Sequence, residues 1–212
     1  MYKNYIFDLD GTLLDTLEDL ANAVNYALKK MNYPVRTLDE VRSFIGDGMK
    51  MLIRRSVPAE AGEAECAETL QYYSSCYLEH VADCTKPYDG IEELLGTLKK
   101  RGCRLAVVSN KPDLQTQRLI RECFGDIFDA VAGQKEGVKT KPDPEAVLGI
   151  MEIIGAEKDS TVYIGDSDVD VLTAHNAELP CIGVTWGNRS REVLIENGAE
   201  FIADSAADIL KF

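Results

Sequence analysis

The sequence predicts an α/β fold, in which a Rossmann-like parallel sheet carries helices on both faces and an all-helical domain is inserted after the first strand. Short apolar runs, typical of strands buried on both faces, recur along the 212 residues. From residue 90 onward, amphipathic helical stretches alternate with these runs, as in parallel sheets. Residues 17–84 contain no convincing strand, and this block is too long to be a single crossover helix.

The expected strands are the apolar runs themselves. They cover residues 5–7, 104–108, 130–132, 161–164 and 181–184. Among and around them, the helical period fits residues 90–101, 113–123, 144–154 and 168–177.

The block after the first strand is expected to form a domain of its own. Pro34, Pro58 and Gly62 divide it into segments. Its expected helices cover about 17–31, 37–44, 48–56 and 62–81. Because the block is self-sufficient in apolar residues, we divide the chain into a core of residues 1–16 and 85–212 and an inserted domain of residues 17–84. Hinges are expected near 16–17 and 84–86.

Composition and charge exclude several classes of partner. Asp and Glu number 36 against 23 Lys and Arg, and the resulting net charge of −13 argues against binding nucleic acid or an anionic membrane. The chain has neither a run of about 18 apolar residues nor a recognisable signal peptide. Its six cysteines are scattered and form no CxxC pair, which indicates reduced thiols and a cytoplasmic location. The sequence does not indicate an oligomeric state.

Polar side chains follow the expected strands, at the sheet edge where open parallel sheets bind ligands. Asp8 and Asp10 follow the first strand, Ser109 and Asn110 the second, and Asp166 the fourth. Carboxylates crowded at one edge repel each other, and a divalent cation relieves this repulsion. Because the ligands are all oxygens, we expect Mg²⁺.

The same edge has the composition of a phosphoryl-transfer site. Lys141, in a loop before an expected helix, adds a positive charge, and Ser109 adds a hydroxyl donor. Backbone amides at Gly11 and Asn110 complete a cradle for a phosphoryl group. The Asp-x-Asp spacing permits one carboxylate to attack phosphorus while the other serves as general acid and base.

The residues at these positions resemble the four signatures of the haloacid dehalogenase superfamily of phosphatases. The segment DLDGTLLD at 8–15 is similar to the first signature, and Ser109 in VVSNK to the second. Lys141 in KPDP is similar to the third, and GDSDVD at 165–170 to the fourth. All four occur in the superfamily's order over nearly the whole chain. The resemblance implies that the inserted block is an all-helical cap domain.

The resemblance also implies a role for each site residue. Asp8 would be the nucleophile and a metal ligand, and Asp10 the general acid and base with its carbonyl on the metal. The implied metal ligands are Asp8, Asp10, Asp166 and Asp170. The residues expected to bind the phosphoryl group or substrate are Gly11, Thr12, Ser109, Asn110, Lys141, Gly46 and Arg54. Because Asp10 is present where dehalogenases and phosphonatases lack an aspartate, phosphate-ester chemistry is favoured.

Two observations bear on the substrate, which we expect to be a small phosphorylated metabolite. Residues 87–90, 109–112 and 183–187 are similar to those of phosphoglycolate phosphatases. Within residues 41–56, four cations (Arg42, Lys50, Arg54 and Arg55) face one acid, Asp47. If this patch faces the catalytic edge, it favours a substrate whose leaving group is anionic, such as phosphoglycolate.

Other functions fit parts of the same pattern. A β-phosphoglucomutase-like sugar phosphomutase resembles the chain in both core and cap, and a pyrophosphatase or nucleotidase of the superfamily would share the core. A receiver-like signalling domain gathers similar residues around Mg²⁺ but is usually near half this length.

Two features depart from the superfamily pattern. Lys135 and Lys139 lie before Lys141 in a loop expected to be more acidic, and Lys139 competes with Lys141 for the third signature, although Pro142 makes Lys141 the better match. In addition, Ala177-Glu178-Leu179 replaces the Ala-Gly pair that usually follows the fourth signature.

Overall fold

The computed structural model describes residues 2–212, which form two compact units. One unit consists of the residues up to Asp15 together with Pro87–Phe212, and the other is Thr16–Lys86. None of the helices in the described part of the chain is long and apolar enough to cross a bilayer.

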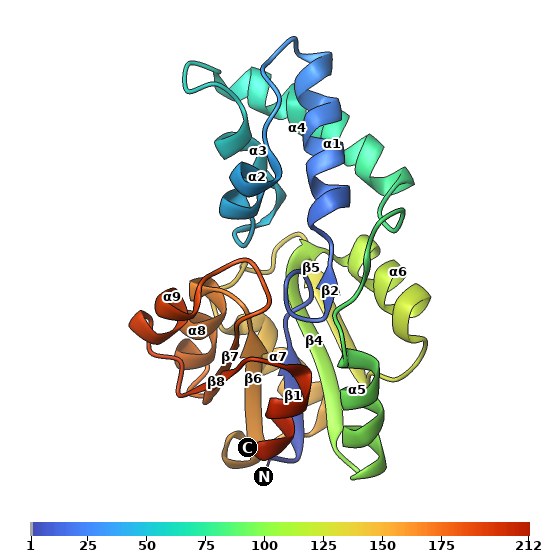
Figure 1. The fold of residues 1–212 in the computed structure, drawn as a ribbon, viewed down its shortest axis with the longest axis vertical. Coiled ribbons are helices and arrows are strands. Elements are labelled where there is room, and N and C mark those ends of the chain that lie inside the picture. The colour runs from blue at the N-terminus through green and yellow to red at the C-terminus, as the bar shows by residue number, and fades with distance from the viewer. Residues whose placement is uncertain (1) are drawn as a thin grey trace. The chain divides into compact units, whose positions relative to one another are not determined.

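Within residues 2–212, the first unit contains a six-stranded parallel sheet (Figure 1). Its strand order is β5-β4-β1-β6-β7-β8. The strands are β1 (Asn4–Phe7), β4 (Arg104–Pro112), β5 (Ala130–Gln134), β6 (Thr161–Gly165), β7 (Cys181–Val184) and β8 (Phe201–Ala203). The α/β fold with a parallel sheet is therefore confirmed. It places β4, β1 and β6 side by side at the centre, with most of the predicted site residues at their carboxyl ends. Ser109 and Asn110, which were expected to follow the second strand, lie within the last residues of β4.

Helices cover both faces of this sheet. They are α5 (Ile91–Lys100), α6 (Asp113–Phe124), α7 (Glu145–Ile154), α8 (Asp168–Asn176) and α9 (Arg191–Glu196), with short 3-10 helices at Lys158–Ser160 and Ala206–Lys211. Alternate strand residues such as Ile6, Ala106 and Tyr163 pack into one buried cluster with α7 and α8. Figure 1 shows α5 in front of the sheet and α7 behind it.

Among the strands of the six-stranded sheet and the α-helices of this unit, β8 and α9 escaped prediction. β8 is a three-residue strand at the sheet edge, and α9 has six residues and buries only Leu194. α9 carries less than two turns of the helical period, which is too little to detect. Length does not explain why β8 was missed, because the predicted run at residues 5–7 is equally short.

The second unit is helical, as the sequence predicts. Its helices are α1 (Leu17–Lys30), α2 (Leu38–Phe44), α3 (Gly48–Ser56) and α4 (Glu63–Glu79). Thr37 begins α2 with a capping box, in which its hydroxyl accepts from Glu40 N and the Glu40 carboxylate accepts from Thr37 N. The segments that enter and leave this unit pair as β2 (Leu14–Asp15) and β3 (Lys86–Pro87).

A buried carboxylate joins the two ends of the helical unit. Asp19, in the first turn of α1, is only 2% exposed. Its oxygens accept hydrogen bonds from Cys84 N (3.0 Å) and from Thr85 N (2.8 Å) and Oγ1 (2.7 Å). The start of the first helix and the chain leaving the last helix are thereby fixed to each other.

The departure at Glu178 has a local explanation. Glu178 follows α8 with a φ of +59°, in the left-handed region that favours glycine. The backbone turn is thus the same one that glycine would make. Glu178 instead ion-pairs with Lys158, with an Nζ to Oε2 distance of 2.7 Å at the surface.

Candidate active site

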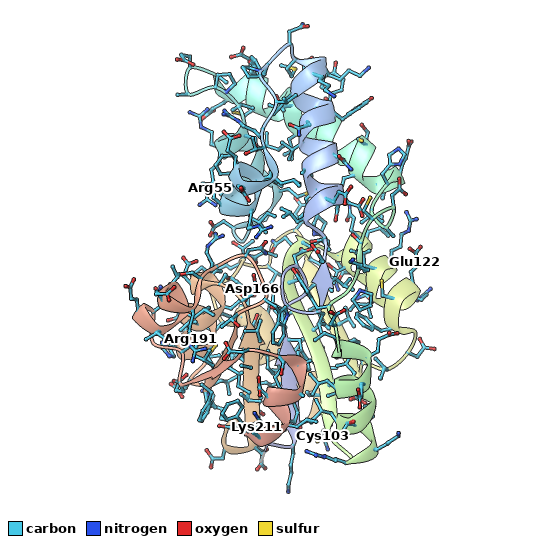
Figure 2. All side chains as sticks on the ribbon, viewed as in Figure 1. Arg55, Cys103, Glu122, Asp166, Arg191 and Lys211 are labelled. Atoms are coloured by element: carbon cyan, nitrogen blue, oxygen red, sulfur yellow. The ribbon has the colours of Figure 1, made fainter. Side chains whose placement is uncertain are left out.

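The predicted site residues of the core meet at the carboxyl edge of the sheet. Asp8 follows β1, Ser109 lies near the end of β4, and Asp166 follows β6, as Figure 2 shows for Asp166. The Asp8 amide donates to Ile164 O at 2.9 Å, which continues the β1–β6 ladder to the first carboxylate. Because β1 is paired on both sides, Asp8 is held by a rigid backbone.

Lys141 lies between two carboxylates of this edge. Its ammonium is 2.8 Å from Asp8 Oδ1 and 2.7 Å from Asp170 Oδ1, and it also donates to the Tyr163 hydroxyl at 3.1 Å. The side chain is only 3% exposed. Lys139, the other lysine before Pro142, instead pairs with Asp143 at the surface. Of these two lysines, Lys141 is therefore the one that lies among the carboxylates.

The Asn110 side chain holds the backbone of Lys141. Its Oδ1 accepts from Lys141 N at 2.8 Å, and its Nδ2 donates to Lys141 O at 3.2 Å. We predicted Asn110 as part of the phosphate cradle. The geometry shows that its side chain positions Lys141, while a phosphate contact through its backbone amide stays a prediction.

Asp166 is held by donors from two loops. Thr12 Oγ1 donates to Asp166 Oδ1 at 3.0 Å, while Asn188 N (2.7 Å) and Asn188 Nδ2 (3.1 Å) donate to Asp166 Oδ2. Gly187 packs directly against the carboxylate, because a Cβ there would lie 2.3 Å from Asp166 Cβ. A Cβ at Gly11, whose φ is +88°, would lie 2.3 Å from Asp166 Oδ2. Both positions therefore require glycine.

Asp170 is fully buried and uses its two oxygens differently. Oδ2 accepts from Ser167 N and Oγ in a capping box that starts α8. Oδ1 faces Lys141 and the Tyr163 hydroxyl. Asp170 thus fixes the start of a helix and supplies a charge to the site at the same time.

Three carboxylates of the site fit a divalent cation. Asp8, Asp166 and Asp170 offer oxygens that all lie within 4.8 Å of one another. Burial, and then the charge of Asp170, raise the pKa of Asp8 well above its usual range and that of Asp166 to about 7. Such shifts show that these groups are poorly accommodated as anions without a counter-charge.

The balance of charges in the site also favours a bound divalent cation. When all of them are ionised, the carboxylates of Asp8, Asp10, Asp166 and Asp170 outnumber the ammonium groups of Lys111 and Lys141 by two. This excess, in a set of oxygen donors, is the charge that one divalent cation offsets.

Asp10 has a partner that the sequence analysis missed. Lys111 Nζ lies 2.8 Å from Asp10 Oδ1, and the Lys111 side chain is only 3% exposed. The Lys111 amide donates to Ser109 Oγ at 3.2 Å. The sequence could have indicated Lys111 as a site residue, because Lys111 belongs to the segment that resembles the second signature. The sequence also gave no sign of Asn188 or Tyr163 as partners of the carboxylates.

Two predicted phosphate-binding residues have contacts inside the core. The Gly11 amide donates to Leu14 O at 2.9 Å within its own loop, and the Thr12 hydroxyl serves Asp166. Trp186 also fixes this loop, because its Nε1 donates to Thr12 O at 3.0 Å. The roles of Gly11 and Thr12 in binding phosphate stay predictions.

The predicted substrate residues of the helical unit also have local contacts. Arg54 donates to Ala61 O at 2.6 Å and to Cys66 Sγ at 3.3 Å, which supports the connection from α3 to α4. Gly46 has a φ of +127°, so its backbone turn requires glycine. Whether Arg54 and Gly46 bind substrate stays a prediction.

The comparison with protein families agrees with the four signatures. Residues 5–184 match the family model described as haloacid dehalogenase-like hydrolase. The chain belongs to this family, and the resemblance identified from the signatures is confirmed. The protein is therefore a hydrolase with an α/β core.

Two relatives with similar sequences are described as phosphoglycolate phosphatases. The chain is 32% identical over 211 residues to phosphoglycolate phosphatase 1 of Pseudomonas aeruginosa, covering 97% of this chain and 77% of that protein. It is 35% identical over 209 residues to the phosphoglycolate phosphatase of Caulobacter vibrioides, covering 97% and 88%. A crystal structure from Lactobacillus delbrueckii subsp. bulgaricus has a TM-score of 0.94 and 34% identity, covering 98% and 96%.

Proposed function

We propose that this hydrolase is a Mg²⁺-dependent phosphatase that hydrolyses phosphoglycolate to glycolate and phosphate. The observation that carries the proposal is the Asp8 carboxylate, which lies beside Lys141 within a cluster of acids that fits a divalent cation. The relatives described as phosphoglycolate phosphatases support the choice of substrate. We also propose a cytoplasmic location, which the six free cysteines support because thiols stay reduced in that compartment.

In this proposal, Asp8 is the nucleophile of the first step. An Asp8 carboxylate oxygen attacks phosphorus, the bond from phosphorus to the ester oxygen breaks, and an aspartyl phosphate forms. Asp10 donates its proton to the departing alkoxide, which leaves as the alcohol. Asp8, Asp166 and Asp170 would hold Mg²⁺, which would supply positive charge to offset the negative charge on the phosphoryl oxygens.

The second step regenerates the enzyme. Asp10 removes a proton from a water molecule, whose oxygen attacks phosphorus, and the bond from phosphorus to Asp8 breaks. Lys141 and Ser109 hold the phosphoryl group in both steps, and Asn110 keeps Lys141 in place. We further propose that the helical unit is the cap domain that the resemblance implies.

The test is phosphate release from a panel of esters in the presence of Mg²⁺. The panel contains phosphoglycolate, sugar phosphates, nucleoside monophosphates, pyrophosphate and an aryl phosphate. We expect phosphoglycolate to give the highest kcat/KM and Asp8→Asn to abolish turnover. Turnover of the aryl phosphate alone would reject the substrate while keeping the reaction class. Turnover of a sugar phosphate only with a bisphosphate primer would favour the mutase, and no turnover at all would reject the proposal.

A further inference from the structure

Lys111 is a buried cation to which the steps above give no task. It lies in the last residues of β4, where Thr116 Oγ1 donates to its carbonyl at 3.1 Å and its own amide donates to Ser109 Oγ. These contacts fix its backbone at both ends. The side chain is 3% exposed, although lysines are rarely buried unless a specific anion requires them.

The two buried lysines serve opposite ends of the reaction. Lys141 contacts Asp8 and Asp170, on the side where the nucleophile attacks. Lys111 contacts Asp10, which in the proposed mechanism protonates the leaving group. The Lys111 ammonium therefore lies on the leaving-group side of the site, 2.8 Å from Asp10 Oδ1.

The structure of the leaving group determines which substrate group would lie near the Lys111 ammonium. A general acid works within about 2.6–3.2 Å of the oxygen that it protonates. In the phosphate ester of a 2-hydroxy acid, a single carbon separates that oxygen from the carboxylate. When the ester oxygen lies on Asp10, the carboxylate therefore lies within reach of an ammonium that itself contacts Asp10.

We propose that the Lys111 ammonium binds the carboxylate of the leaving group and makes the enzyme select phosphate esters of short 2-hydroxy acids. This assignment rests on the proposed function and deepens it, because it places recognition of the substrate carboxylate in the core. It does not depend on the cations of the helical unit. A charge-assisted hydrogen bond in a buried site is strong enough for such selection.

The test compares two substrates that differ at this one group. Phosphoglycolate carries a carboxylate, and 2-hydroxyethyl phosphate carries a neutral hydroxymethyl group in its place. The readout is the ratio of kcat/KM for phosphoglycolate to kcat/KM for 2-hydroxyethyl phosphate. Lys111→Met lowers both rates, since Asp10 loses a partner, but this shared loss cancels in the ratio. We expect the ratio to fall by at least about 30-fold.

Two further variants keep the test decisive. Lys111→Arg retains a cation, so its ratio should lie closer to that of the wild type than the ratio of Lys111→Met. Lys99→Met removes a lysine that pairs with Asp129 at the surface of the same unit, and its ratio should not change. Thermal unfolding of each variant confirms that the protein assayed is folded. If Lys111→Met does not fold, Lys111→Gln decides, because it also removes the charge, and an unchanged ratio in that variant would overturn the inference.

The outcomes separate this inference from the proposed function. Equal losses on both substrates in Lys111→Met would overturn the inference, because Lys111 would then act only through Asp10. That result would leave the proposed function standing, provided the wild type still prefers phosphoglycolate. A wild type that does not prefer phosphoglycolate over 2-hydroxyethyl phosphate would instead reject the substrate itself, and the inference with it.

Discussion

The side-chain amide of Asn110 pairs with the peptide groups of Lys141 as one strand residue pairs with another. It accepts from Lys141 N at 2.8 Å and donates to Lys141 O at 3.2 Å, and this whole arrangement is buried. A lysine in a loop is thereby held as firmly as a residue of the sheet. The ammonium that contacts Asp8 therefore depends on a residue 31 positions earlier in the chain.

Removing this amide should reduce catalysis. In Asn110→Ala, Lys141 loses both backbone partners, and small displacements at an active site cost about 100-fold in rate. We expect kcat to fall by about 10- to 100-fold with a smaller change in KM, as measured by steady-state phosphate release. Asn110→Asp keeps the acceptor for Lys141 N, so its kcat should lie between those of Asn110→Ala and the wild type. Asn197→Ala, which removes an amide that donates to Val193 O at the end of α9, is the control. A KM effect without a kcat effect would contradict the positioning role.

The glycines packed against Asp166 give a second prediction. In Gly187→Ala the new Cβ would lie 2.3 Å from Asp166 Cβ and 2.4 Å from Gly11 O, so the metal ligand or the Gly11 loop must move. We expect a loss of about 1–3 kcal/mol in unfolding free energy and at least a tenfold loss of activity. Urea unfolding and phosphate release measure the two effects.

A glycine of the same unit supplies the matched control. Gly96 lies within α5, and a Cβ there has no atom within 4 Å. Gly96→Ala should therefore raise the unfolding free energy by about 0.5–1 kcal/mol and leave turnover unchanged. If the two variants behaved alike, the close packing at Asp166 would not be responsible.

Asp19 should be a main determinant of stability in the helical unit. Asp19→Ala removes the acceptor of the Cys84 and Thr85 amides, whose hydrogen bonds to this carboxylate are partly buried. We expect a loss of about 2–4 kcal/mol in unfolding free energy, measured by urea unfolding. Asp39→Ala, at an exposed position in the first turn of α2, should cost less than about 1 kcal/mol. Equal costs would show that Asp19 acts only as a helix N-terminal charge.

The raised pKa of Asp166 predicts how Mg²⁺ and pH act together on stability. Its carboxyl titrates near 3.8 ordinarily but at about 7 in the folded, metal-free protein. The folded state therefore holds the proton more tightly, so this group's contribution to stability is complete below about pH 4 and is lost as the pH rises through 7. Mg²⁺ replaces the proton, so its stabilising effect should be larger at pH 8 than at pH 5.

Thermal unfolding with EDTA or excess MgCl2 at the two pH values measures this effect. The difference in Tm between the two conditions isolates the site, because titrating groups remote from it contribute equally to both. Asp166→Asn should remove most of that difference. A Tm increase of the same size at pH 5 and pH 8 would show that proton and metal do not compete for this carboxylate.

The sequence predicts most of this fold because its elements have clear local patterns. Apolar runs such as residues 105–108 are buried on both faces, and helices such as α1 and α5 show the helical period. α9, with six residues, is too short to show the helical period. Asp8, Asp166 and Lys141 were predicted because each follows a strand or belongs to a signature.

The partners of these residues could not be predicted in the same way. Asn188 reaches Asp166 from a loop 22 positions later, and the path of that loop depends on Trp186 and Thr12. Tyr163 looks like any aromatic residue of a buried strand until its hydroxyl is seen beside Lys141. Such contacts depend on tertiary structure, which no local period encodes.

The most direct test of the central claim is detection of phosphate on Asp8. The enzyme is mixed rapidly with phosphoglycolate labelled in its phosphoryl group, quenched in acid within the first turnover, and digested. The account predicts protein-bound label in the peptide that contains Asp8, which forms and decays at rates consistent with kcat, and no label in Asp8→Asn. Phosphate release by the wild type with no such label at any quench time, while Asp10→Asn also fails to accumulate it, would contradict the account.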